Sequence, residues 1–284
     1  MSAGRFSLFA AILATYLVAG ILYITFTPAW QAPDEPAHFN YVRYLTTNAG
    51  FPELTSGCYN QAYLDQLKSQ NFPPELPVDN VCYEYHQPPL YYVLATPVFV
   101  LSSGSIIALR LFSLLLGAGV VILAFFTGKT IFPGSPSLAF GTMAFVAFVP
   151  MHVAILSSIN NDALAELILA AILFALARRI MQTNLRTTRA SLFIGALLGI
   201  GLITKTTVYI AVPVIAVALL LIEFPRQNES IFKINWRRLF KHAAIIYGLA
   251  LLIALPWYIR NTNLYGNLDI LGLTRHDEIV IGQD

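Results

Sequence analysis

Long apolar runs dominate the chain and alternate with short polar stretches. The first run covers residues 6–26. Six further runs follow at 105–127, 137–156, 163–177, 190–204, 206–224 and 243–258. A helix needs about 20 apolar residues to cross the hydrocarbon core of a bilayer, and most of these runs approach that length. The pattern therefore predicts an all-α polytopic membrane protein with about seven transmembrane helices.

The composition agrees with this pattern. Only 11% of the residues are charged, whereas a soluble domain carries about 25%, so most of the surface must face lipid. The net charge of +2 is too small and too dispersed to indicate a nucleic-acid partner. Arg5 precedes the first run as in a signal peptide, but the run is longer than a signal peptide's apolar region. We therefore interpret it as the first transmembrane helix.

Basic residues between the runs predict the orientation. Two clusters lie at 178–189 and 226–241, and Lys129 lies alone in a short turn. All three fall on the cytoplasmic side, as the positive-inside rule requires, if the N-terminus is cytoplasmic and the run 91–101 does not cross the membrane. That run is short, and Pro97 interrupts it. We therefore predict a multi-pass protein of the cell inner membrane with a non-spanning helix at 91–101.

This orientation places a long loop, residues 27–88, and a tail, residues 260–284, on the external side. His38, Tyr41 and Leu45 fall on one helical face, so the loop is expected to hold an amphipathic helix along the interface. The second interfacial helix is the non-spanning one that follows the loop. The whole chain, 1–284, is then one membrane module.

The only two cysteines, Cys58 and Cys82, both lie in this loop. Outside the cytoplasm a disulfide between them is favoured, and it would stabilise a loop of this length by about 3 kcal/mol. The alternative is a pair of free thiols.

Acidic residues beside the membrane are the first candidates for chemistry. Asp34, Glu35 and His38 directly follow the first span. One acid could simply cap the following helix, with Pro36 in its first turn. Capping does not account for two acids and a histidine, so we favour a catalytic role for Asp34 and Glu35.

A second acidic pair begins a later span. Asp162 and Glu166 are one turn apart and share a helix face. Asp162 could be a helix cap, or a catalytic acid. Glu166 lies in an apolar run, where an acid costs about 2.5–3.5 kcal/mol unless it faces a cavity or a partner.

Cations supply the complementary charge. The run before Lys205, residues 190–204, would rise only about 22 Å, short of the roughly 30 Å core. Lys205 should therefore lie recessed between two helices, suited to a phosphate or to pairing with an acid. Arg110 lies about one turn inside its span and either snorkels or faces a polar cavity. Arg260 follows the last span, where a lone arginine weakly favours an anionic partner.

Three glycines in the run before Lys205 should allow close helix packing. They are Gly195, Gly199 and Gly201.

Acids and cations in one pocket would allow a group transfer, with a carboxylate as general base and a cation holding a phosphate leaving group. No phosphate-binding glycine loop of the P-loop or Rossmann type is present. A cytosolic nucleotide donor therefore has no visible site in the sequence.

Six motifs, in order, resemble those of the GT-C glycosyltransferases, especially protein O-mannosyltransferases and aminoarabinose transferases. They are Pro-Asp-Glu-Pro-Ala-His (33–38), His-Gln-Pro-Pro-Leu-Tyr-Tyr (86–92), Leu-Arg-Leu (109–111), Asn-Asn-Asp (160–162), Gly-Leu-Ile-Thr-Lys (201–205) and Pro-Trp-Tyr-Ile-Arg-Asn (256–261). The resemblance implies many membrane helices, two juxtamembrane helices in the first external loop, and a polyprenyl-phosphate-linked sugar donor.

The resemblance also implies roles for single residues. Asp34 matches the first-loop acid, a general base or acceptor-positioning group, and Asp162 matches the second-loop acid. Lys205 and Arg110 match cations near the donor phosphate. We count Arg260 and His86 with them. Some members bind a divalent metal near the loop acids, so Glu35 and His38 are the metal candidates, although the sequence implies no certain cofactor.

The leading hypothesis is therefore an enzyme, a glycosyltransferase of hexosyl or pentosyl groups. It would move a sugar from the lipid phosphate to an unknown glycan, lipid or protein acceptor on the external face. The alternative is a non-catalytic membrane subunit or lipid-phosphate-binding scaffold, with a transporter as a weaker third. Family members usually continue further, so we expect this chain to correspond to the N-terminal membrane module, with the C-terminal part missing.

Overall fold

The computed structural model describes residues 3–182, 184, 186–223, 234–266 and 268–281. Within these ranges the regular elements are all helices, and no strand is found. The fold is thus all-α, as the hydropathy pattern predicted. The chain divides into two compact units. Unit 1 holds residues 1–118, 147–164 and 257–284, and unit 2 holds 119–146 and 165–256.

Four helical segments among the described residues are long and apolar enough to cross a membrane. They are α1 (Ala3–Phe26), α5 (Ile106–Ile131), Thr206–Glu223, and α11 (Trp236–Tyr265). A bent pair of helices raises the number to five if it counts as one span. The other two predicted spans correspond to α8 (Asp162–Met181) and α9 (Thr188–Leu202), and crossing by these two stays a prediction. The predicted basic residues Arg226 and Lys233 lie outside the described residues.

The span predicted at 137–156 is broken into two helices, and its crossing of the membrane stays a prediction. The structure has α6 (Pro136–Phe148) and α7 (Pro150–Leu156), bent by 63° at the break. Proline lacks the backbone N–H that a helix needs and disfavours the helical conformation in the residue before it. Val149, which precedes Pro150, is accordingly extended, with ψ of 112°.

The interruption that we expected at Pro97 is not found. Helix α4 runs from Leu90 to Leu101 with Pro97 inside it. Twelve residues rise about 18 Å, short of a bilayer core, so the helix is too short to span, as predicted.

The first loop of unit 1 folds into short helices around a small core. Its elements are α2 (Glu35–Thr47), η1 (Ser56–Cys58), α3 (Gln61–Ser69) and η2 (Tyr83–His86). Helix α2 packs on α4 and η2, and Ala37, Leu67 and Tyr83 lie in one buried cluster. A disulfide joins Cys58 to Cys82. Near the C-terminus, α12 (Leu273–Ile279) packs on η2. These contacts fix the loop to the helices of the same unit.

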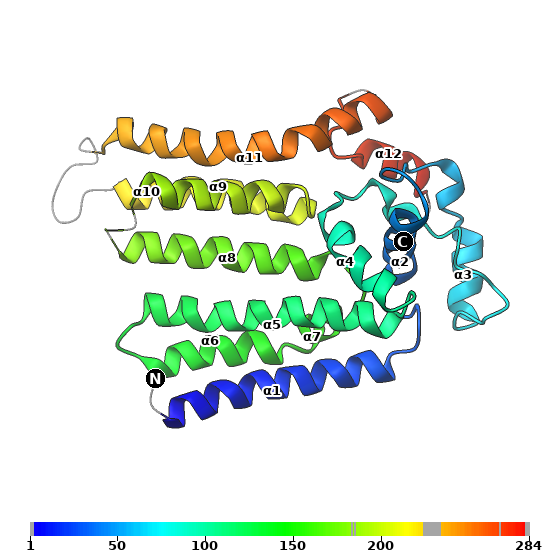
Figure 1. The fold of residues 1–284 in the computed structure, drawn as a ribbon, viewed down its shortest axis with the longest axis horizontal. Helices are drawn as coiled ribbons and strands as arrows, with labels where there is room; N and C mark the ends of the chain where they lie inside the picture. The colour runs from blue at the N-terminus through cyan, green and yellow to red at the C-terminus, as the bar shows by residue number, and fades with distance from the viewer. Residues whose placement is uncertain (1–2, 183, 185, 224–233, 267, 282–284) are drawn as a thin grey trace. The chain divides into compact units, whose positions relative to one another are not determined.

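Unit 2 contains the second half of α5, most of α6 and of α8, then α9, η4 (Thr206–Ile210), α10 (Ala211–Glu223) and the first part of α11. Its long helices run alongside one another (Figure 1). Helix α9 approaches α11 closely, as its glycines predicted. A Cβ at Gly195 would lie 2.8 Å from the Ile246 carbonyl oxygen, and one at Gly199 would lie 2.8 Å from Ile253 Cβ. Only glycine permits backbones to pack this closely.

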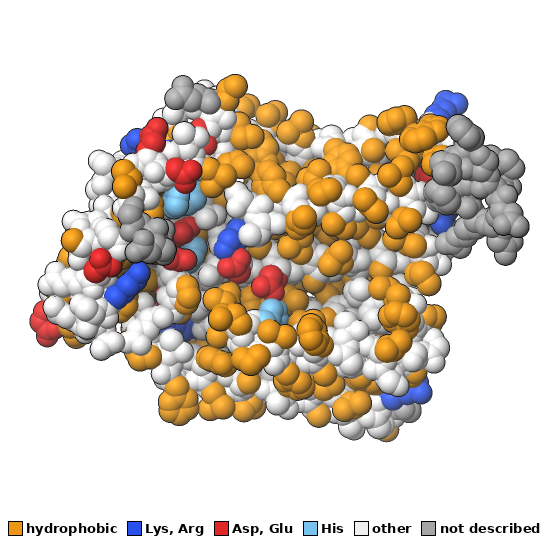
Figure 2. All heavy atoms as spheres, turned by 180° about the vertical axis from the view of Figure 1, so that it is seen from behind, with side chains coloured by type: hydrophobic (Ala, Val, Ile, Leu, Met, Phe, Trp, Pro, Cys, Tyr) orange, Lys and Arg blue, Asp and Glu red, His pale blue; other side chains and the backbone are white. Residues whose placement is uncertain are grey.

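Many large hydrophobic side chains point outward from the helices, among them Leu101, Phe145 and Leu252. On the face seen in Figure 2, hydrophobic side chains cover much of the surface, and acidic and histidine side chains gather in one region. A surface of this kind fits a lipid environment, because a soluble protein rarely exposes large continuous apolar patches.

Candidate functional site

The backbone at the start of α2 is unusual. Asp34 occupies the N-cap position, but with φ of 57° and ψ of 7° it lies in the left-handed region, and its side chain makes no capping hydrogen bond. Its Oδ1 instead accepts a hydrogen bond of 2.8 Å from the Tyr83 hydroxyl. Left-handed backbone is uncommon for residues other than glycine, although aspartate and asparagine adopt it more often than the rest. Helix capping, the structural explanation left open from sequence, therefore does not account for this carboxylate.

The pKa of Tyr83 is shifted in the direction that supports this hydrogen bond. Burial raises the pKa of its hydroxyl far above the usual value, and the negative charge of Asp34 raises that pKa further. Tyr83 therefore stays protonated and donates to the carboxylate. Sequence reasoning missed Tyr83, since it lies 49 residues from Asp34 and nothing in its local pattern sets it apart from other loop tyrosines.

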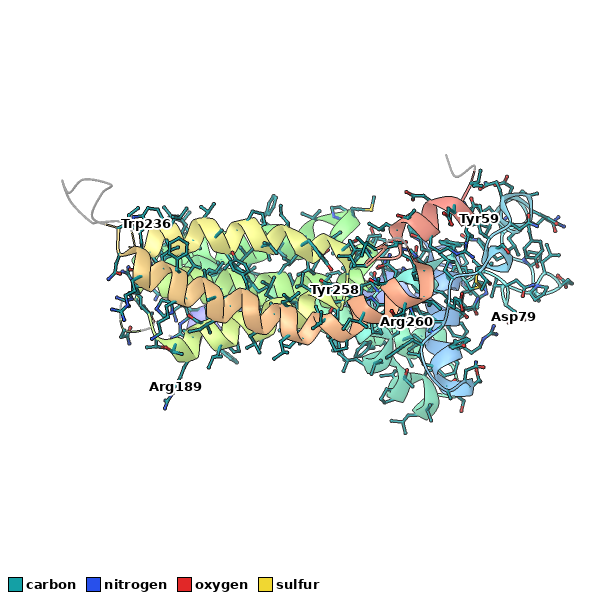
Figure 3. All side chains as sticks on the ribbon, turned by 90° about the horizontal axis from the view of Figure 1, so that it is seen from above. Tyr59, Asp79, Arg189, Trp236, Tyr258 and Arg260 are labelled. Atoms are coloured by element: carbon teal, nitrogen blue, oxygen red, sulfur yellow. A yellow bond between two sulfur atoms is a disulfide. The ribbon has the colours of Figure 1, made fainter. Side chains whose placement is uncertain are left out.

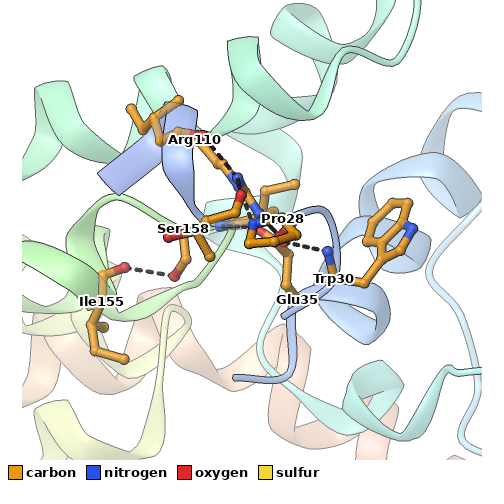
Figure 4. Close-up of polar contacts among 9 residues, drawn as sticks. Pro28, Trp30, Glu35, Arg110, Ile155 and Ser158 are labelled. Carbon is orange, nitrogen blue, oxygen red and sulfur yellow. Dashed lines mark hydrogen bonds and ion pairs between the residues drawn. The ribbon is translucent and has the colours of Figure 1, made fainter. Parts of the chain in front are cut away.

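Glu35, the next residue, forms a fully buried ion pair with Arg110 (Figure 4). Arg110 Nη2 lies 2.6 Å from Glu35 Oε2, and Nε lies 2.7 Å from Oε1. The other guanidinium donors bind backbone carbonyl oxygens. These belong to Ile24, Thr27 and Pro28. We call this arrangement the arginine clamp.

The arginine clamp uses all five N–H groups of a guanidinium. Arg110 is 2% exposed, so of the two alternatives given by the sequence, snorkelling to the surface does not apply. In this arrangement no donor of Arg110 is left for a phosphate. Arg110 instead ties the end of α1 to the start of α2 and sets the position of Asp34.

The arginine clamp also holds the turn before α8. The backbone N–H groups of Trp30 and Ile159 donate to Glu35, at 3.0 Å to Oε2 and 3.3 Å to Oε1. Asn161 Nδ2 donates to Gln87 Oε1 at 3.3 Å. The hydrogen bonds of Ile159 and Asn161 bring the 157–162 turn, which carries Asp162, against the loop that carries Asp34.

Asp162 is the first residue of α8, and its backbone N–H donates to Asn160 Oδ1 at 2.8 Å. The side chain is partly exposed. Asp34 and Asp162 therefore both belong to unit 1, on segments that share Glu35 as a partner. Lys205 and Glu166 belong to unit 2, where Lys205 is the N-cap residue of η4 and is half-buried. Its predicted role at a donor phosphate stays a prediction.

The two metal candidates have other partners. Both oxygens of Glu35 are bound in the arginine clamp, and His38 Nδ1 lies 2.8 Å from the Tyr92 hydroxyl. Among the described residues, no group of three or more histidine, cysteine or acidic side chains is placed to hold a metal ion. Glu35 and His38 thus have partners within the protein, and a metal role for them stays a prediction.

His86 is buried, and its Nδ1 lies 3.0 Å from the Tyr83 carbonyl oxygen. Burial, followed by the charge of neighbouring His276, lowers the pKa of His86 to about 4. The ring is therefore neutral at physiological pH and would meet a phosphate as a hydrogen-bond partner, not as a cation.

Arg260 lies at the edge of a pocket of about 420 Å³ in unit 1. Its guanidinium lies 4.7 Å from the Trp257 ring centroid and donates to Asn261 Oδ1 at 2.9 Å and to the carbonyl of Pro52. Phe51 and Glu53 also line this pocket. Arg260 is thus oriented by neighbours and remains partly exposed.

Fold and site together define an all-α multi-pass membrane protein. Two of its turns carry acidic residues, and both turns bind the buried Glu35 carboxylate that pairs with Arg110. A family model described as dolichyl-phosphate-mannose-protein mannosyltransferase matches residues 86–259, more than half of the chain. The chain belongs to this family, which is of the GT-C type. No match was found among curated proteins or solved structures. The matched region includes Arg110, Asp162 and Lys205, and begins after Asp34.

Proposed function

We propose that this protein transfers a sugar from a polyprenyl-phosphate-linked donor to an acceptor on the external face of the membrane, with Asp34 as the general base. The family is one of polyprenyl-phosphate-sugar-dependent glycosyltransferases, which gives the donor class. One observation supports the role of Asp34. Its side chain makes no capping hydrogen bond and instead accepts one from Tyr83, while its backbone lies in the left-handed region, where strain is often found at functional sites.

The reaction needs a base beside the acceptor. Asp34 takes the proton of an acceptor hydroxyl while that oxygen attacks the anomeric carbon of the sugar. The bond from this carbon to the phosphate oxygen breaks, and the lipid phosphate leaves with the electron pair. Tyr83 orients the carboxylate through its hydrogen bond. Arg260, half-exposed beside its pocket, is the unit 1 cation that we propose for the developing phosphate charge.

Asp162 supports the acceptor in this proposal. It begins α8 on a turn that two hydrogen bonds anchor to the first loop. A carboxylate there, in addition to Asp34, can accept a second hydrogen bond from a sugar or acceptor hydroxyl.

The proposal is tested by Asp34→Asn, which keeps the size of the side chain and removes the base. With purified protein in lipid, labelled polyprenyl-phosphate sugar and a membrane extract as acceptor source, turnover should fall about 10²- to 10⁴-fold. Retention of the labelled donor should stay close to that of the unmodified chain. Asp65→Asn is the matched control, since Asp65 is an exposed acid of the same loop.

Undiminished turnover in Asp34→Asn would refute the role of Asp34. Donor retention without turnover in the unmodified chain would instead favour the non-catalytic scaffold. Lys205→Ala, compared with Lys68→Ala, tests the separate prediction that Lys205 strengthens donor retention.

A further inference from the structure

Unit 2 contains a second buried arginine whose bonding differs from that of Arg110. Arg179, in the last turns of α8, is 1% exposed. Its Nη1 donates to Ser191 Oγ at 2.8 Å. Within the described part of the chain, its Nε and Nη2 are buried without any hydrogen-bond partner. A buried charged group that lacks partners is costly, so such groups normally bind an opposite charge.

Arg179 lines a cavity of about 440 Å³ between the end of α8 and the start of α9. Two more arginines, Arg178 and Arg189, line the same cavity. The guanidinium of Arg178 lies 5.7 Å from the ring centroid of Phe174, another lining residue. Figure 3 shows Arg189 extending outward from the start of α9. Three arginines thus line one cavity of unit 2.

The nearby acid leaves an excess of positive charge. Glu223 attracts Arg179 electrostatically, but its Oε1 lies 3.3 Å from Nε of a different residue, Arg238. Ser191 Oγ, the partner of Arg179, also lies 2.8 Å from His242 Nδ1. Among the described residues, no acidic side chain lines the cavity. An anion would therefore meet several cations and no repelling carboxylate from this part of the cavity wall.

We propose that this cavity binds the phosphate of an anionic phospholipid headgroup. Guanidinium groups bind phosphate oxygens through paired, charge-assisted hydrogen bonds, and Nε and Nη2 of Arg179 are the two donors on one edge of its plane. The partial positive charge at the N-terminus of α9, a 15-residue helix, adds to this attraction.

The apolar part of the cavity favours a lipid over a soluble phosphate. Phe174, Phe193 and Ile194 line it beside the arginines, and Phe193 is 58% exposed. The cavity lies where one apolar helix ends and the next begins, the level at which headgroups meet the protein. An acyl chain could pack on these side chains while the phosphate contacts the arginines.

The test uses the purified chain in detergent micelles, with lipid binding measured by native mass spectrometry and thermal unfolding. Phosphatidylglycerol should be retained and raise the unfolding temperature, phosphatidylcholine should do so much less, and inorganic phosphate should leave it unchanged. The double variant Arg178→Gln/Arg189→Gln should bind phosphatidylglycerol at least tenfold more weakly. These exposed residues lie outside the set proposed for sugar transfer, and Arg237→Gln, at an exposed position of α11, is the control.

Equal retention of phosphatidylglycerol by the double variant and the control would overturn the site. A thermal shift produced by inorganic phosphate and not by phosphatidylglycerol would overturn the lipid assignment. Arg179→Gln provides a second measurement on the buried group itself. If it folds, it should lose the phosphatidylglycerol shift while Arg237→Gln keeps it.

Discussion

Two of the arginines that the structure describes are almost completely buried, and they differ in how their N–H donors are used. Arg110 in unit 1 gives all five N–H groups to one carboxylate and three backbone carbonyls. Arg179 in unit 2 has one hydrogen bond, to Ser191, and leaves Nε and Nη2 without partners among the described residues. Both are 2% exposed or less.

This difference separates a structural charge from a ligand-binding one. A guanidinium whose donors are all bonded inside the protein joins segments and has nothing left for a ligand. A guanidinium with unbonded, buried donors carries a desolvation cost that an anion would remove. By this criterion Arg110 organises the loop that holds Asp34, and Arg179 is the residue that we propose binds an anion.

The largest effect is expected when the arginine clamp is broken. Arg110→Met leaves the Glu35 carboxylate buried without its cation, so the free energy of unfolding should fall by about 3–5 kcal/mol. Arg179→Met is the matched control. Because it removes a charge that is poorly bonded, its effect in lipid-free micelles should stay within about 1 kcal/mol. Chemical unfolding of both variants measures this contrast, and equal losses would contradict the comparison.

A smaller loss is expected when the helix that carries Ser191 is displaced. A side chain at Gly195 meets the backbone of Ile246, with the carbonyl oxygen at 2.8 Å and Cα at 3.0 Å. Gly195→Val should therefore push α9 from α11 and destabilise the protein by about 1–3 kcal/mol. Gly141→Val in α6 is the control, since nothing lies within 4 Å of its added Cβ. Equal unfolding temperatures for the two variants would show that α9 and α11 are not closely packed.

Gly195→Val should also weaken phosphatidylglycerol binding at the Arg179 cavity. Ser191 of α9 lies one turn before Gly195 and connects Arg179 of α8 to His242 of α11. If phosphatidylglycerol binding is unchanged while stability falls, the cavity does not depend on this packing.

A pH dependence of stability is also expected in unit 1. The pKa of His86 is lowered to about 4 in the folded protein, against about 6.5 for an unperturbed histidine. Between these pH values the unfolded chain binds a proton that the folded chain does not, so stability should fall as the pH drops from 7 to 4. His86→Gln should flatten this part of the unfolding profile.

Burial is the main cause of the lowered pKa of His86, with the charge of His276 second. His276→Gln should therefore retain most of the pH dependence. If that variant loses it entirely, repulsion between the two histidines, and not burial, sets the pKa.

The sequence predicted the features that depend on local pattern. The all-α fold, the short helix before the second span and the close approach at Gly195 follow from hydropathy, length and residue size. Local rules left a helix cap open as the role of Asp34 and gave no sign of the break at Pro150. The fold decides both, through the hydrogen bond from Tyr83 and through the proline geometry. The Glu35–Arg110 pair could not be predicted. Its partners are 75 residues apart, and only the folded chain decides which buried charges meet.

The most direct test of the account asks where the lipid-linked sugar binds. A photoreactive polyprenyl-phosphate sugar can be cross-linked to the purified chain, and the labelled peptides can be identified by mass spectrometry. The account predicts labels in residues 28–41 and 157–162, around Asp34 and Asp162, at the same level in the Arg178→Gln/Arg189→Gln variant. Labels confined to residues 174–193, and lost in that variant, would place the donor at the Arg179 cavity and contradict the assignment of both sites.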